Sequence, residues 1–187
     1  MTQGYLAIVL HAHLPYIRHA EHEEFLEEDW LFEAITETYL PLILSWQRMA
    51  GDNTPFALTL SLTPPLLEMF ADPLLQDRYA RYLDRRCELM EREIVRTRWH
   101  GDLHRNANFY AERFRLLRAA YEDQYHRDLI AAFRQFQQSG HIEILTCAAT
   151  HGFLPLMSTP NGVRAQLATA ARAHKRHLGA APRGIWL

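Results

Sequence analysis

The sequence predicts an α/β fold in which parallel strands alternate with helices, as in the front part of a parallel α/β barrel. The first observation is the unbroken apolar run Tyr5–Leu10, which is typical of a strand buried on both faces. The second is the order of predicted elements over 187 residues: strand, helix, strand, two long helical stretches, strand, helix and the start of a strand. The third is that two of these strands are followed by histidines, at the end where such folds carry their chemistry.

The first predicted strand runs into His11 and His13, and Pro15 ends it because proline has no N–H for the ladder. Residues two apart on a strand point to the same side, so the two imidazoles are expected to converge. They are either two core histidines whose ring nitrogens have hydrogen-bond partners, or part of a functional site. Because buried polar rings are costly without a role, we interpret them as candidate functional residues.

An acidic segment, 21–29, follows and leads to Trp30. It is either a solvated connection or a loop that contributes to a site, since loops after strands carry function in this architecture. A tryptophan beside carboxylates suits the apolar face and the hydroxyl groups of a sugar. Trp30 is therefore a candidate sugar-binding residue.

Apolar residues at helical spacing predict a helix over Glu33–Met49, kinked or divided at Pro41 and ended at Gly51. Partial alternation then predicts a second strand over Phe56–Leu62. The prolines of Thr63-Pro64-Pro65 end this strand abruptly.

Two long helical stretches with no strand between them predict a helical insertion at about residues 75–139. The first runs from about Asp77 to Arg96, and its arginines and glutamates are expected to form a solvated, salt-bridged surface. The segment Trp99–Asn108 indicates a turn between the two stretches, although a loop over a site is the alternative. The second stretch is expected to stop near Ser139.

The third predicted strand is His141–Cys147, and Thr150-His151 lies just past its end. This repeats the arrangement of the first strand, a strand followed by a histidine, and it favours a site at this edge of the sheet. Glu143 is the carboxylate on this strand. It belongs to the strand interior, so we do not expect it to be a catalytic nucleophile.

A last helix is predicted over Val163–Leu178, with Ser158 or Thr159 as its cap, and Gly184–Leu187 begins another strand. Barrels of this kind need about 250 residues. We therefore expect residues 1–187 to be the N-terminal portion of a catalytic barrel, truncated at the start of a strand.

The composition excludes several classes of protein. The net charge is −2, and positive and negative residues are interspersed, which does not form the basic face of a nucleic-acid-binding protein. The cysteines Cys87 and Cys147 are far apart and are expected to be buried thiols. No apolar run approaches the length of a membrane span. We expect a soluble, cytoplasmic protein that binds neither nucleic acid nor membranes.

Five segments together resemble glycoside hydrolase family 57, and most closely its α-1,4-glucan branching enzymes. They occur in the family's order along nearly the whole chain: HAHLPY at 11–16, EEDWLFEAITETYLPL at 27–42, SLTPPLLEMF at 61–70, GHIEILTCAATHGFLPL at 140–156 and GIWL at 184–187.

The resemblance implies an incomplete (β/α)7 TIM-like barrel that uses a Glu nucleophile and an Asp acid/base in a retaining double displacement. It implies that the nucleophile lies just after Leu187 and the acid/base further on, so no catalytic residue is expected within the chain. The implied substrate is an α-glucan such as amylose or a glycogen-like polysaccharide, without a cofactor or metal. The residues that the resemblance implies in substrate binding are His11, His13, Trp30, Thr150 and His151.

Two other classes of protein stay open. The pair His11 and His13 at a first barrel strand, with His151 later, is also how metal-dependent amidohydrolase-type enzymes hold zinc. A zinc site of that kind does not account for three segments: LPY at 14–16, the acidic segment that leads to Trp30, and GIWL at 184–187. The third possibility is a non-catalytic glucan-binding module, which the missing carboxylates would permit.

Overall fold

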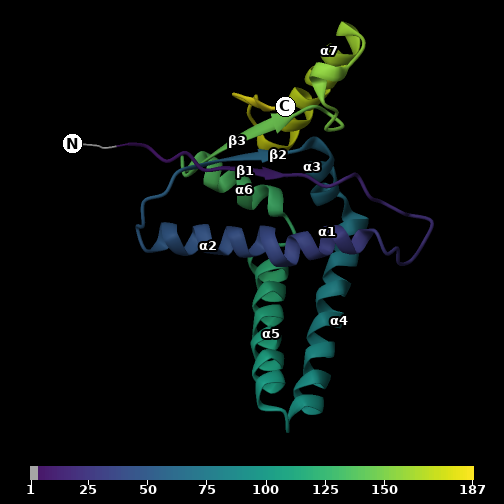
Figure 1. Cartoon of the computed structure of the whole chain (residues 1–187), viewed down its shortest axis with the longest axis vertical. Helices are drawn as coiled ribbons and strands as arrows, with labels where there is room; N and C mark the ends of the chain where they lie inside the picture. The colour runs from purple at the N-terminus through teal and green to yellow at the C-terminus, as the bar shows by residue number, and fades with distance from the viewer. Residues whose placement is uncertain (1–3) are drawn as a thin grey trace.

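The computed structural model describes residues 4–187, and its centre is a parallel sheet (Figure 1). The strands of this described part are β1 (Val9–Ala12), β2 (Leu58–Leu62), β3 (Ile142–Cys147) and β4 (Ile185–Trp186). They lie in the order β1-β2-β3-β4, and each neighbouring pair is parallel. Strands that follow one another in the chain are thus neighbours in the sheet, as at the start of an α/β barrel, and the predicted fold class is confirmed.

The prediction for the first strand was wrong in its bounds and burial. β1 begins at Val9, and the side chains of Tyr5 and Leu6 before it are 98% and 88% exposed. Within the described chain β1 is an edge strand with a neighbour on one side only. An apolar run therefore does not by itself show that a strand is covered on both faces.

A long helical segment follows β1, built from α1 (Glu28–Ala34), a π-helical turn (Ile35–Tyr39) and α2 (Leu40–Gly51). Pro41 has no N–H to donate, and the N–H of Leu40 reaches back five residues to the carbonyl of Ile35. The predicted division near Pro41 and the end at Gly51 are confirmed.

Trp30 lies in the first turn of α1, so the prediction that it belongs to a loop was wrong. The acidic residues Glu28 and Asp29, read from the sequence as loop, occupy that same turn. Negative side chains are favourable there because the N-terminus of a helix carries partial positive charge.

The connection from β2 to β3 is helical: α3 (Pro64–Ala71), α4 (Pro73–Thr97), α5 (Gly101–Ala119), a π-helical turn (Ala120–Gln124) and α6 (Leu129–Gln138). Figure 1 shows α4 and α5 as a long antiparallel pair that extends away from the sheet. The exact limits of the predicted insertion, about 75–139, stay a prediction.

Two starts of helices in this connection differ from the prediction. The sequence reading missed α3, whose first turn carries Pro64 and Pro65, because prolines were taken only as the end of a strand. It also placed the start of α4 too late, since Asp72 caps that helix by accepting the N–H groups of Leu74 and Leu75. The predicted turn at 99–108 is real but short, because α5 already begins at Gly101.

The last helix, α7 (Pro160–Leu178), follows the short 3-10 turn Leu154–Leu156 and agrees with the prediction. Thr159 caps it by accepting the N–H of Gly162 at 3.1 Å. Gly179 ends it with a φ of +81°, a conformation that favours glycine.

One apolar core joins the sheet to the helices packed on it. Its fully buried side chains include Leu40, Ile43, Leu62, Leu67 and Phe133. Of the two free thiols, Cys147 is buried and Cys87 is partly buried. Among residues 4–187 we find no helix that combines the length and the apolar character needed to cross a bilayer.

A buried ion pair fixes the segment between β1 and α1. Nη1 of Arg78 on α4 donates to Oε1 of Glu28 at 2.5 Å, and the two side chains are 6% and 1% exposed. Arg78 also donates to the carbonyl oxygens of His19 and His22, and the same Glu28 oxygen accepts the N–H of His19 at 3.1 Å. Arg78 therefore ties the acidic segment to α4.

We expect Arg78→Ala to lower the free energy of unfolding by about 3–5 kcal/mol, because it leaves the Glu28 carboxylate buried without its partner. Urea unfolding followed by circular dichroism would measure the change. Arg96→Ala, which removes an exposed partner of Glu93 on the same helix, is the control and should change stability far less. Equal effects of the two substitutions would contradict a special role for Arg78.

Candidate functional site

Three histidines meet at the carboxyl end of the sheet. His11 is in β1, His13 follows it, and His151 comes after β3, 140 residues along the chain from His11. Nε2 of His11 lies 3.3 Å from Nε2 of His151, and the rings of His13 and His151 have centroids 3.9 Å apart. The structure therefore brings together the histidines of both strand ends. We call these three residues the histidine cluster.

Residues of the neighbouring strands support the cluster. Nδ1 of His13 lies 3.2 Å from Oγ1 of Thr63, a buried residue directly after β2. Trp186 of β4 stacks on His11 with centroids 5.0 Å apart and an interplanar angle of 20°. Each strand of the described sheet thus contributes, at or after its carboxyl end, either a residue of the cluster or a residue that contacts it.

Gln166 of α7 holds Thr150 beside the cluster. The N–H of Thr150 donates to Oε1 of Gln166 at 2.9 Å, and Nε2 of Gln166 donates to Oγ1 of Thr150 at 3.0 Å. The next residue, His151, has a φ of +56°, which is uncommon for a residue with a side chain. Backbone strain of this kind persists only where the surroundings enforce it, and the paired bonds of Gln166 are part of that enforcement.

The cluster favours neutral imidazoles. Burial, together with repulsion from the nearby His151 and His11, lowers the pKa of His13 to about 4. Burial and His151 also lower the pKa of His11. In the contact between His11 and His151 one ring must donate and the other accept, which neutral rings can do. His11 and His13 can therefore donate and accept hydrogen bonds at neutral pH without carrying charge.

Glu143 does not belong to this site. It is the second residue of β3, near the amino end of the strand, and its carboxylate faces Arg183 at 3.8 Å. That Glu143 is not a nucleophile stays a prediction, and its position away from the cluster is in line with it. Within residues 4–187 we find no group of three or more His, Cys, Asp or Glu side chains arranged to hold a metal ion.

Trp30 is not among the contacts of the histidine cluster. It is 52% exposed and lines a hollow on α1 together with Tyr82, Arg86 and Phe114 of the helical pair α4 and α5. Of the five predicted binding residues, the structure therefore groups His11, His13, Thr150 and His151 and places Trp30 at another surface.

Sequence reasoning missed three supporting residues: Thr63, Gln166 and Trp186. Thr63 had a usable signal, because it follows a strand just as His13 and His151 do. Trp186 had the weaker signal of an apolar residue in a strand start. No sequence signal marked Gln166, because its role depends on how α7 packs beside the loop after β3.

A parallel sheet whose strands lie in sequential order, with polar side chains gathered at their carboxyl ends, is the arrangement of α/β-barrel enzymes. Within this class, residues 7–187 match the sequence profile of Glycosyl hydrolase family 57. The chain belongs to this family, as its motifs led us to expect.

Known relatives agree with this assignment. The chain is 34% identical over 185 residues to a 1,4-alpha-glucan branching enzyme of Thermococcus kodakarensis. The matched residues make up 99% of this chain and 27% of that protein. Among solved structures, an alpha-amylase of Thermotoga maritima matches with a TM-score of 0.94 and 42% identity, over 100% of this chain and 35% of the other. A GH57-type branching enzyme of Pyrococcus horikoshii matches with a TM-score of 0.92 and 34% identity, over 100% and 34%. The chain thus spans about a third of the length of these relatives.

We expect the protein to lose stability as the pH falls from 6.5 toward about 4, in part because of His13. In this range the unfolded chain binds a proton at His13 that the folded protein does not, so protonation favours unfolding; below about pH 4 both states are protonated and this loss stops. NMR titration of the ring should show His13 neutral down to about pH 4. In His13→Gln, thermal unfolding should depend less steeply on pH across this window, and an unchanged slope would contradict the assignment.

Proposed function

We propose that the protein to which these residues belong acts on α-1,4-glucan, and that its reaction is 1,4-α-glucan branching by retaining double displacement. The observation that carries this proposal is the cluster of His11, His13 and His151 at the carboxyl ends of the strands. Membership in Glycosyl hydrolase family 57 supports it, as do the branching enzymes among the relatives.

The role of the cluster follows from its chemistry. Neutral imidazoles donate and accept hydrogen bonds, as sugar hydroxyl groups do, so they can hold a glucose unit in a fixed orientation. Thr150, held by Gln166, adds a hydroxyl group to the same edge. We assign His11, His13, Thr150 and His151 to substrate binding and orientation.

The bond-breaking step needs two carboxylates about 5–5.5 Å apart, one that attacks the anomeric carbon and one that protonates the leaving oxygen. We propose that a Glu and an Asp outside residues 1–187 supply them. This is supported by the share of the relatives that the chain spans and by the position of Glu143 away from the cluster.

Hydrolysis of α-1,4-glucan is the second candidate activity. It is favoured by the 42% identity to the alpha-amylase of Thermotoga maritima. The two reactions share the glycosyl-enzyme step and differ in whether a sugar hydroxyl or water accepts the glycosyl group. The residues that exclude water would decide between them.

A metal-dependent hydrolase is less well supported than either activity. The family assignment favours chemistry with carboxylates. A non-catalytic glucan-binding role for the isolated 187 residues fits the same cluster and needs no carboxylate pair. We further propose that the protein is cytoplasmic and takes part in glycogen biosynthesis, in line with an α-glucan substrate.

The proposal is tested with the protein that the whole gene encodes. Branching should lower the iodine absorbance of amylose without new reducing ends, whereas hydrolysis should create them. His151→Ala should lower kcat by about 100-fold, since loss of an orienting contact misplaces the reacting sugar. His100→Ala, in the exposed turn between α4 and α5, is the matched control and should keep full activity.

Full turnover by His151→Ala would show that the cluster is structural. Absence of any action on amylose by the unaltered protein would refute the proposed substrate. Robust turnover by residues 1–187 alone would show that the chemistry lies in side chains that we have assigned to structure or binding.

A further inference from the structure

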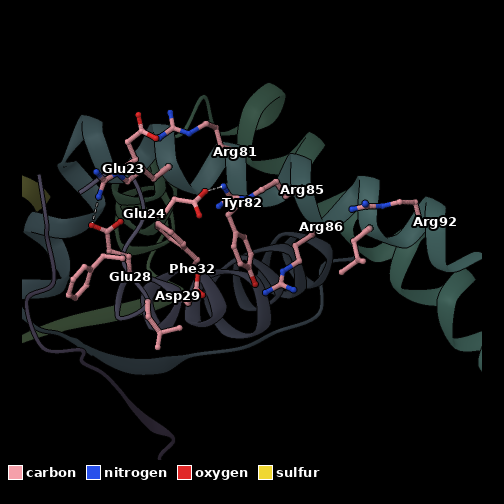
Figure 2. A pocket seen from close by; sticks show the side chains of 14 residues that line it. Glu23, Glu24, Glu28, Asp29, Phe32, Arg81, Tyr82, Arg85, Arg86 and Arg92 are labelled. Carbon is pink, nitrogen blue, oxygen red and sulfur yellow. Dashed lines mark hydrogen bonds and ion pairs between the residues drawn. The ribbon is translucent and has the colours of Figure 1, made fainter. Parts of the chain in front are cut away.

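A groove of about 520 Å³ lies between residues 23–29 of the acidic segment and one face of α4 (Figure 2). None of the residues that line it belongs to the histidine cluster. The lining residues of α4 recur every three or four positions, which puts them on a single helical face. The volume is within the range of about 300–1,000 Å³ that is usual for small-molecule sites.

The lining of the groove carries both signs of charge. Five arginines come from α4: Arg78, Arg81, Arg85, Arg86 and Arg92. Four carboxylates face them from the acidic segment and the start of α1: Glu23, Glu24, Glu28 and Asp29. Two ion pairs join the sides, Arg78 with Glu28 and Arg85 with Glu24.

Much of this hydrogen-bonding capacity is available to a ligand. Arg81, Arg86 and Arg92 form no ion pair within residues 4–187. The pair of Arg85 and Glu24 is open to solvent, with side chains 51% and 72% exposed, so its two groups can exchange partners readily. The buried pair of Arg78 and Glu28 holds the two walls in place beneath them.

The chemistry of the lining selects the class of ligand. Arginine only donates hydrogen bonds and carboxylate only accepts them, so a partner for the whole groove must do both. Sugar hydroxyl groups do both. A phosphate or another anion would gain from the arginines but would be repelled by the carboxylates. Half-buried Phe25 adds an apolar patch to the wall of the groove. Phe32 and Tyr82 are buried, and Arg86 lies over the Tyr82 ring, so these two rings close the groove and do not stack on a ligand.

A second hollow borders the groove, and together the two suit an extended ligand. Tyr82 and Arg86 line both. The second hollow measures about 570 Å³ and includes the exposed indole of Trp30. Figure 2 shows Arg81, Arg85, Arg86 and Arg92 spread along α4, with their guanidinium groups apart from one another. An oligosaccharide of several units can contact donors that are spread in this way.

We propose that this groove between the acidic segment and α4 is a second α-glucan-binding site, separate from the histidine cluster, for a stretch of chain that is not being cleaved. The proposal rests on the proposed function, because it takes the same class of substrate. It also gives Trp30 a sugar contact at the surface where the structure places it.

The test uses the 187-residue protein and maltoheptaose, followed by amide chemical shifts in NMR. We expect two groups of amides to shift on titration. One lies around residues 11–13 and 148–151, and the other lies around residues 23–30 and 81–92.

Arg92→Gln should weaken binding at the second group about tenfold, because it removes a charged hydrogen-bond donor. The first group should keep its affinity. Arg96→Gln, one turn further along α4 and outside the groove, is the matched control and should leave both groups as they are. Circular dichroism would confirm that both variants fold.

The outcomes separate this inference from the proposed function. Shifts at the histidine cluster alone would overturn the second site and leave the proposed function standing. Shifts at the groove alone would support the second site and count against the role of the histidines. No shifts at either would overturn both. Shifts at the groove with pyrophosphate but not with maltoheptaose would show an anion site and would also overturn the inference.

Discussion

The buried guanidinium of Arg78 is the interaction on which the organisation of this surface depends. It joins α4, the acidic segment after β1 and the first turn of α1 through Glu28 and two backbone carbonyl groups. The acidic segment lies in the stretch of chain that connects His13 to Trp30. Fixing it on α4 therefore sets the exit of the chain from the strand end and also forms one wall of the groove.

A buried ion pair is a costly way to hold a segment, since both charges lose their hydration. Here the cost is offset by the number of bonds that one guanidinium makes. An apolar pair of the same size would fill the space but would leave the carbonyl groups of His19 and His22 without this donor. The planar, multivalent arginine side chain suits a place where a segment with little regular structure meets a helix.

The sequence predicted the parallel fold and the histidine cluster because both follow from local rules. His11 and His13 share a face by strand geometry, and His151 joins them because parallel strands end at one edge. The sequence could not predict the partners of Arg78, since its sequence neighbours mark it only as one of many arginines on an amphipathic helix. Its burial depends on a segment about 50 residues away in sequence. Nor could the sequence place Trp30, because whether the acidic residues cap a helix or form a loop is decided by the packing of α1.

The two surfaces that we propose for sugar binding differ in how their side chains are arranged. The histidine cluster holds its rings in close contact, supported from β2 and β4 by Thr63 and Trp186, which suits the precise orientation of one glucose unit. The groove instead spreads charged, partly exposed side chains along α4, and these can exchange partners as a chain slides past. A polymer-acting enzyme benefits from both. A rigid site aligns the reacting unit, and an adaptable one raises the local concentration of the chain without fixing its register. The division is a direct consequence of the fold, because strand ends converge on a point whereas a helix face presents its side chains along a line.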